Sequence, residues 1–305
     1  MLRTTIGKVG RKLWEAACPS LTELPYRIAL VKHNRQLPTL TPSERTMVET
    51  CKREGICVTS LQELGLGTTA KMLESAQEQL AVMESVHSTN ADQTLGDEAS
   101  PMYPQIFAVK DLPNFAHWGE ESALLRIVEN YIGLAVAFQG VHLRRDFSNK
   151  KPITTELWHR DLEDRRMLKA IVYLTDVEEA HGSFEYIPKS QMSFGRSLRI
   201  QLAVIWQIVR SRLAGKRDVI GIDDQTLNQV VPQSEWQACV GSAGTVLLVD
   251  PTAIFHHGRS RQAGRSTLFF VYTAENPLRP ECCTQYSDQT FARPSALKAL
   301  VESSN

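Results

Sequence analysis

The sequence predicts a mainly β fold with helical support, of the α+β class. Two observations lead to this prediction: helical patterns dominate the chain up to Gly133, and short β-rich runs separated by turn residues dominate from Leu134 onward. Short strands with turn signals between them are typical of a β-sandwich or barrel. No glycine-rich nucleotide-binding loop lies between a strand and a helix, so a nucleotide-binding fold is not favoured.

The first clear helix start lies near residue 41. Thr41 is the expected N-cap, Pro42 occupies the first turn and Glu44 completes a capping box. This helix should end near Arg53, because the run Gly55–Thr59 then predicts a short strand.

Two further helices are predicted before the β-rich part. One covers residues 68–86 and the other covers residues 120–132, where Gly133 should end it. The intervening residues 87–105 are polar and rich in Ser, Thr, Asn and Asp, so we expect a loop there.

Five runs rich in β-branched and aromatic residues predict strands. These runs are Leu134–Leu143, Met167–Leu174, Ser183–Ile187, Thr245–Val249 and Thr267–Thr273. Residues 191–236 interrupt them, and within this interval the apolar stretch Ser197–Ala214, with interleaved arginines, predicts an amphipathic helix. That helix is either an insertion packed on the mouth of a barrel or a lid over a hydrophobic or carrier-bound substrate, and the pattern is compatible with both.

Composition limits the classes of function. The chain has 305 residues, 42% of them hydrophobic, with a formal net charge of +0, so its overall charge gives no reason to expect nucleic-acid binding. No apolar run is long enough to span a membrane, and no secretory signal is apparent. The six cysteines form no C-x-x-C pair, so we expect free thiols, including the adjacent Cys282 and Cys283, and a reducing, cytoplasmic environment.

Two segments are basic and apolar at helical spacing, namely residues 1–36 and 196–217. Each is either a helix packed on the main body or an element that contacts an anionic membrane surface or a carrier protein. The sequence leaves both interpretations open.

The candidate site combines two separated motifs, Trp158-His159-Arg160-Asp161 and Phe255-His256-His257-Gly258, followed by Arg265. Residues two apart in a strand point to the same face, so one metal ion can contact both side chains of the His-x-Asp pair. A distant histidine completes a face of two imidazoles and one carboxylate, which leaves coordination positions open and suits the Fe(II) of non-haem oxygenases. The alternative is a surface His–Asp pair and a solvated turn.

These residues resemble the phytanoyl-CoA dioxygenase family of Fe(II)/2-oxoglutarate-dependent oxygenases, over roughly residues 130–275. The motifs that carry the resemblance are Trp158–Asp161, Leu168–Val177, His181–Phe184, Ile187–Ser190, Gly244–Asp250, Phe255–Gly258 and Arg265. The resemblance implies a double-stranded β-helix, that is, a jelly roll. We therefore expect a basic helical extension over residues 1–40, a single jelly-roll domain over 41–280 with a helical insertion at about 191–236, and a tail over 281–305.

The resemblance also implies the role of each site residue. His159, Asp161 and a distal histidine would bind Fe(II), and Arg265 would pair with the distal carboxylate of 2-oxoglutarate, a contact that suits the planar guanidinium. Thr267 lies two residues further on the same face and would add a hydroxyl to that carboxylate. Lys169 would help to bind cosubstrate or substrate, or would extend to solvent.

Two adjacent histidines compete for the distal position. His256 follows Phe255, precedes an x-Gly pair and lies nine residues before Arg265, so it is the preferred ligand. His257 is the alternative, because neighbouring strand residues face opposite sides and only one imidazole should point inward.

The expected reaction is hydroxylation of an unactivated C–H bond of a small, hydrophobic or carrier-linked molecule, using O2 and releasing succinate and CO2, with ascorbate as a reductant in vitro. Hydroxylation is favoured over halogenation because Asp161 is retained. The rival hypotheses are a metal-binding jelly roll without turnover, acting as a sensor or scaffold, and a peripheral membrane or carrier binder. The sequence identifies neither the substrate nor the oligomeric state.

Overall fold

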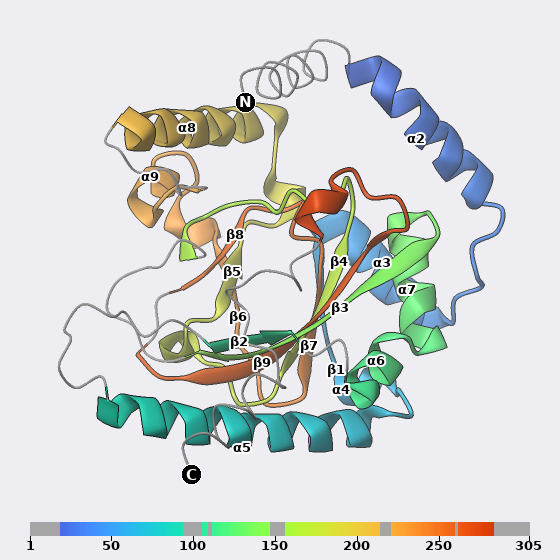
Figure 1. The fold of residues 1–305 in the computed structure, drawn as a ribbon. Helices are drawn as coiled ribbons and strands as arrows, with labels where there is room; N and C mark the ends of the chain where they lie inside the picture. The colour runs from blue at the N-terminus through green and yellow to red at the C-terminus, as the bar shows by residue number, and fades with distance from the viewer. Residues whose placement is uncertain are drawn as a thin grey trace, which may run out of the picture.

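The computed structural model describes residues 19–93, 105–108, 112–146, 156–213, 221–259 and 262–283. In these ranges the strands form two antiparallel sheets (Figure 1). The larger sheet has the order β1-β7-β4-β9-β3-β2 and the smaller has the order β6-β5-β8. The strands are β1 Ile56–Ser60, β2 Gln105–Ala108, β3 Val136–Asp146, β4 Leu168–Tyr173, β5 Phe184–Tyr186, β6 Gln237–Cys239, β7 Thr245–Val249, β8 His256–Gly258 and β9 Arg265–Ala274. The predicted α+β jelly roll is confirmed.

Along the chain, most helices come before β3, and α8 and α9 lie between β5 and β6. They are α2 Pro19–His33, α3 Pro42–Glu54, α4 Leu61–Leu64, α5 Thr69–Gln93, α6 Pro113–Gly119, α7 Ser122–Ile132, α8 Phe194–Leu213 and α9 Asp224–Asn228. Short 3-10 turns are η2 Glu179–His181, η3 Lys189–Gln191, η4 Gln233–Glu235 and η5 Pro280–Cys282. The predicted amphipathic helix of the insertion is confirmed as α8, which lies with α9 between β5 and β6.

Local capping explains where the predicted helices begin and end. The hydroxyl of Thr41 accepts a hydrogen bond from the Glu44 amide at 3.3 Å, and the Glu44 carboxylate accepts one from the Thr41 amide at 2.8 Å. Gly55 and Gly133 adopt left-handed backbone with φ of 83° and 82°, which only glycine tolerates readily, and they close α3 and α7.

The predicted loop over residues 87–105 is wrong at both ends. Helix α5 continues through this segment to Gln93, and Gln105 begins β2. The polar composition suggested a loop, but no Gly or Pro stands between 87 and 93, so a helix that is already nucleated can propagate through it.

All five predicted strands are present, whereas β2, β6 and β8 were not predicted. Strand β8 contains only His256, His257 and Gly258, so it lacks the β-branched pattern that signals a strand. Strand β8 forms because it pairs with β5, where Tyr186 lies opposite His256 and Phe184 lies opposite Gly258.

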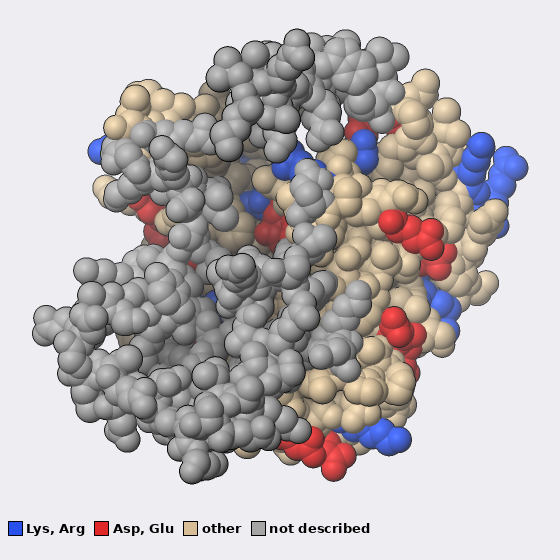
Figure 2. All heavy atoms as spheres, in the orientation of Figure 1, with Lys and Arg blue, Asp and Glu red and all other residues tan. Residues whose placement is uncertain are grey.

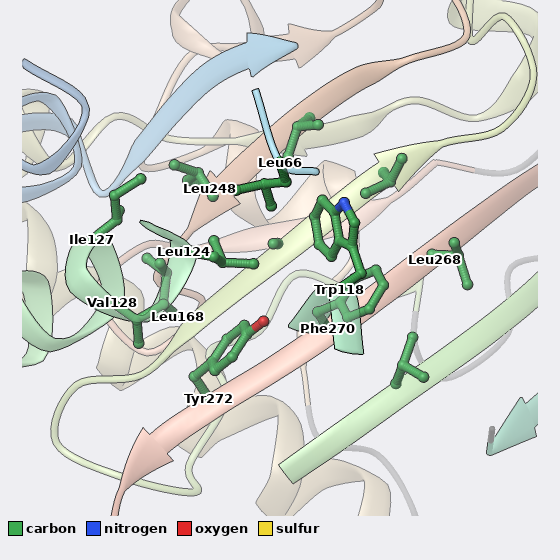
Figure 3. Packing of buried hydrophobic residues seen from close by; sticks show 14 of the residues in the cluster. Leu66, Trp118, Leu124, Ile127, Val128, Leu168, Leu248, Leu268, Phe270 and Tyr272 are labelled. Carbon is green, nitrogen blue, oxygen red and sulfur yellow. The ribbon is translucent and has the colours of Figure 1, made fainter. Parts of the chain in front are cut away.

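The main hydrophobic core lies between the helices and the outer face of the larger sheet (Figure 3). Trp118 of α6 and Phe270 of β9 are fully buried, with ring centroids 4.3 Å apart. The Trp118 indole donates to the Thr69 hydroxyl at 3.1 Å, so its polar atom is also satisfied. Leu124 and Val128 of α7 belong to the same cluster.

A second, smaller cluster fills the space between the two sheets. Ile171 and Tyr173 of β4 and Leu247 of β7 meet Phe184 and Tyr186 of β5 there. The inner face of the larger sheet therefore forms one wall of the barrel interior, and Lys169, Arg265 and Thr267 lie on this face.

Several remaining expectations concern parts of the chain that are described only partly. Cys282 and Cys283 are free thiols, as expected. The extension over 1–40 is helical in α2, while residues 1–18 and 284–305 lie outside the described ranges. Within the described residues, no helix has both the length and the apolar character needed to cross a lipid bilayer.

The core contact of Phe270 predicts a large effect on stability. Phe270→Ala should lower the free energy of unfolding by about 3–5 kcal/mol, because it leaves a cavity against Trp118. Phe194→Ala is the matched control, since Phe194 is 85% exposed and should change stability by less than about 0.5 kcal/mol. Denaturant unfolding of both variants measures the difference, and similar values would contradict this account of the core.

Candidate metal centre

Backbone pairing brings the two histidines together. The His159 amide donates to the His256 carbonyl at 3.0 Å, and the His256 amide donates to the His159 carbonyl at 3.0 Å. This two-bond bridge places their imidazole centroids 4.5 Å apart. Residues from two motifs separated by nearly one hundred positions are thus held side by side by main-chain hydrogen bonds.

Asp161 joins the pair from a loop rather than from a strand, contrary to the strand geometry expected for the His-x-Asp motif. Its amide donates to the Pro251 carbonyl at 3.0 Å, which fixes the turn after His159. Oδ1 of Asp161 lies 3.4 Å from Nε2 of His159 and 3.8 Å from Nε2 of His256. Together the three residues form a group whose ligand atoms all lie within 4.8 Å of one another.

The imidazoles present their Nε2 atoms to the centre. Nδ1 of His159 lies 2.6 Å from the Leu157 carbonyl and Nδ1 of His256 lies 3.4 Å from the Ile254 carbonyl. A carbonyl oxygen only accepts hydrogen bonds, so each Nδ1 carries the proton and each neutral Nε2 keeps a lone pair for a metal ion.

The electrostatics of the group favour a bound cation. Burial lowers the pKa of His256 to about 3, helped by the neighbouring His159. Burial also opposes protonation of His159, but Asp161 and the Leu157 carbonyl outweigh it and raise the pKa. Burial would raise the pKa of Asp161, yet Lys169 and the two histidines hold it well below its usual range. The carboxylate is therefore ionised.

His257 points away from this centre and has other partners. Its Nε2 lies 2.8 Å from the Glu185 carboxylate and its Nδ1 lies 2.9 Å from the Glu156 carbonyl. Its ring stacks on Trp158 with centroids 4.0 Å apart. Both nitrogens face oxygen acceptors, so His257 offers no lone pair to an ion beside Asp161.

Lys169 lies at the metal end of the site. Its ammonium contacts Oδ2 of Asp161 at 2.5 Å and approaches Glu163 at 4.0 Å, so it does not extend to solvent. Burial lowers the pKa of Lys169, but these carboxylates, Asp161 above all, outweigh burial and raise it. Because Lys169 occupies only Oδ2, Oδ1 stays directed toward the two histidines.

Arg265 is buried at the start of β9, where it connects the two sheets. Its Nε donates to Asp146 of β3 at 2.9 Å, and Nη1 donates to the Gly182 carbonyl. A β-carbon placed on Gly258 would lie 3.6 Å from Nη2, so the guanidinium reaches the strand that carries His256.

Two buried hydroxyl groups near Arg265 have no hydrogen-bond partner among the described residues. Thr267 lies two residues along β9 on the same face, and its Oγ1 is buried and unpaired. Ser183, next to Gly182, has the same property. Buried hydroxyls are normally paired, so such atoms indicate where a polar ligand group is missing.

Three polar residues of the site were not predicted from the sequence. His142, Arg144 and Asp146 alternate along β3 and lie opposite Phe269, Thr267 and Arg265 of β9. Alternation with a period of two is the signal that could have placed them inside the barrel. Burial lowers the pKa of His142 to about 3, with contributions from Lys169 and Arg144, so this imidazole is neutral.

The geometry can bind one divalent metal ion and one anion. Two imidazoles and one carboxylate are the donor set of open non-haem iron sites, and a buried guanidinium beside unpaired hydroxyls suits a carboxylate. The structure thus brings His159, Asp161 and His256 together in one group, and it places Arg265 and Thr267 on the inner face of the larger sheet.

The comparisons with known proteins found one family match and a set of similar solved structures. A family model described as phytanoyl-CoA dioxygenase matches residues 66–265, more than half of the chain. No match was found among the curated proteins. Among solved structures, HygX from Streptomyces hygroscopicus with nickel and 2-oxoglutarate bound shares 17% identity, covers 78% of this chain and 88% of its own, and has a TM-score of 0.49.

Two further structures show similar levels of likeness. EctD from S. alaskensis in its apo form has 18% identity, a TM-score of 0.47, and coverage of 77% of this chain and 80% of that chain. The epimerase SnoN in complex with Fe3+, alpha ketoglutarate and nogalamycin RO has 14% identity, a TM-score of 0.45, and coverage of 76% and 84%.

The match to the family model spans the motifs around His159, Asp161 and His256 and extends to Arg265. The chain therefore belongs to the phytanoyl-CoA dioxygenase family of Fe(II)/2-oxoglutarate-dependent oxygenases.

Proposed function

We propose that this oxygenase hydroxylates an unactivated C–H bond of a small, hydrophobic or carrier-linked molecule. The observation that carries the proposal is the convergence of His159, Asp161 and His256 in a barrel whose facing sheet holds Arg265 and Thr267. With iron and 2-oxoglutarate bound, the site supplies oxidative decarboxylation to succinate and CO2, and one atom of O2 enters the substrate as hydroxyl.

The residues of the chain fit both groups. His159, Asp161 and His256 would hold the metal through two neutral Nε2 atoms and an ionised oxygen, which is the protonation state that ligation requires. Arg265 and the unpaired Thr267 hydroxyl would hold the distal carboxylate, and this contact would give the buried Oγ1 the partner it lacks. Asp146 would fix the guanidinium in position.

The retained carboxylate of Asp161 favours hydroxylation. A metal held by this oxygen would leave no place for a halide ion at that position. Beside the site, Phe184 stacks on His256 with centroids 5.2 Å apart, and the Tyr186 ring lies 6.4 Å from that of Phe184. These aromatic walls support an apolar substrate and exclude water from the reacting atoms.

A non-catalytic sensor or scaffold explains less of the structure. Such a protein would use the metal ligands, but it would have no use for a buried guanidinium beside an unpaired Thr267 hydroxyl. The ion pair of Arg265 and Asp146 could by itself be structural, so the unpaired hydroxyl is the feature that distinguishes the two functions.

Turnover of the cosubstrate tests the proposed function directly. The chain with Fe(II), 2-oxoglutarate, O2 and ascorbate should release succinate slowly even without substrate, and His159→Ala should abolish this release because the metal loses a ligand. Succinate is measured by mass spectrometry, with circular dichroism as the folding control. Normal succinate release by a folded His159→Ala variant would overturn the proposal.

The two adjacent histidines should differ in metal binding. His256→Gln should weaken binding of Mn(II), used as a stable probe for the Fe(II) site, by at least about tenfold, the change expected for about 1.4 kcal/mol. His257→Gln removes an imidazole that faces Glu185 and Glu156 instead, so it should leave Mn(II) affinity within about twofold. Calorimetric titration measures both variants, and equal losses would remove His256 from its assigned role.

Replacement of single groups should raise the 2-oxoglutarate requirement. Arg265→Ala should raise the KM for 2-oxoglutarate at least about tenfold, since a desolvated charged contact is worth roughly 2–5 kcal/mol. Thr267→Val, which keeps shape and removes one hydroxyl, should raise this KM about tenfold, consistent with about 1.5 kcal/mol for a hydrogen bond to a charged group.

Thr273→Val is the matched control for the hydroxyl. Thr273 lies on the same strand and face as Thr267, but its Oγ1 already accepts a hydrogen bond from Gln139 at 2.8 Å. The KM of the Thr273→Val variant for 2-oxoglutarate should equal that of the natural protein. Equal KM values for the two valine variants would separate Thr267 from the cosubstrate.

A further inference from the structure

Helix α8 exposes a continuous apolar stripe. Its exposed large apolar residues recur every three or four positions and so share one face of the helix. They are Phe194, Leu198, Leu202, Ile205, Trp206, Val209 and Leu213, and between 45% and 85% of each is exposed. The opposite face is already packed, because Ile200 is fully buried in a cluster with Trp158 and Phe255. Among the described residues, burial therefore does not account for the outer stripe.

The charges on α8 all have one sign. The helix contains four arginines and no acidic residue. Arg196 pairs with Glu235 at 2.6 Å on the side of the body, whereas Arg199 and Arg210 are exposed beside the stripe. In Figure 2 the visible surface at the position of α8 is mostly uncharged, with basic atoms at its outer end. The outer face is thus apolar and basic.

Helix α2 repeats this pattern independently. Leu24, Ile28 and Val31 lie one turn apart and are 55%, 47% and 67% exposed, with the exposed Arg27 and Lys32 next to them. Other residues of α2 hold it to the body, as in the 2.7 Å contact between His33 and Glu129. In the view of Figure 1, α2 and α8 both lie on the side of the molecule opposite α5.

We infer that the outer faces of α8 and α2 bind the surface of an anionic lipid bilayer, with α8 lying in the plane of the headgroups. An interfacial helix of this kind buries its apolar stripe at the acyl boundary and directs its basic residues to lipid phosphates. Trp206 is 69% exposed, and the amphipathic indole is a side chain that prefers this boundary. The inference goes beyond the proposed function and does not depend on it.

The charge pattern favours lipid over two other occupants. A two-fold dimer through α8 would bring helices with four arginines and no acid against each other, which costs like-charge repulsion. An acidic carrier protein would match the arginines, but a charged surface does not require the wide apolar stripe. Lipid satisfies both features at once.

Vesicle sedimentation of the full chain tests this docking. The chain should bind vesicles of phosphatidylcholine that contain phosphatidylglycerol and bind weakly to phosphatidylcholine alone. The doubly substituted Leu202→Ser, Trp206→Ser variant should lose at least about tenfold in vesicle affinity, because two apolar side chains no longer enter the acyl boundary. Arg199→Gln and Arg210→Gln should each cost about fivefold, following about 1 kcal/mol per basic residue near such a surface.

Matched controls lie elsewhere on the surface. Leu278→Ser also removes an exposed leucine, 47% exposed, and Arg45→Gln removes an exposed arginine of α3, so neither should change vesicle binding. On binding, tryptophan emission should shift to the blue as Trp206 enters the bilayer. Trp206→Phe should abolish that shift while the protein still sediments with the vesicles.

Three results would overturn the inference. The first is failure of the full chain to bind anionic vesicles. The second is equal vesicle affinity of the double variant (Leu202→Ser with Trp206→Ser) and the control variant Leu278→Ser. The third comes from light scattering: a natural dimer that the double variant converts to monomer would assign the stripe to a second copy. Succinate release from each variant is measured in detergent-free solution. Normal release together with lost vesicle binding concerns the docking alone, whereas lost release concerns the proposed function.

Discussion

The two-bond bridge between His159 and His256 is the constraint on which the site depends. It fixes both imidazoles through the main chain, so their spacing does not require a metal ion to draw the side chains together. The Asp161 amide adds a third main-chain anchor on Pro251. A site fixed in this way is organised before the ion binds. The conformational entropy that the three ligand residues lose is therefore compensated by the free energy of folding and not by metal binding.

Inside the barrel, charge balance takes the place of solvation. Asp146 compensates Arg265, and Asp161 is shared by Lys169 and the imidazoles. Removal of one member of such a pair leaves an uncompensated buried charge, which costs more than the pair contributes. This explains why inward-facing charged residues are tolerated on β3, β4 and β9, and why His142 between the cations stays neutral.

The elements that could be predicted from the sequence are those specified by neighbouring residues. Thr41, Glu44 and Gly133 mark helix ends through local hydrogen bonds and backbone conformation, and the apolar runs of β4 and β7 reflect burial on both faces. The choice between His256 and His257 depends instead on the register of β8 against β5. That register and the Asp146 partner of Arg265 come from residues far apart in the chain, which no local pattern encodes.

The insertion that carries α8 shows how one helix can serve two surfaces. Its inner residue Ile200 shares a buried cluster with Trp158 and Phe255, which directly precede His159 and His256 in the chain. Packing beneath α8 thus supports the two residues next to the bridge, while the exposed residues of the outer stripe are not members of this cluster. Changes on the outer face can therefore alter what the helix binds without disturbing the metal ligands, whereas a cavity at Ile200 would loosen the strands that hold them.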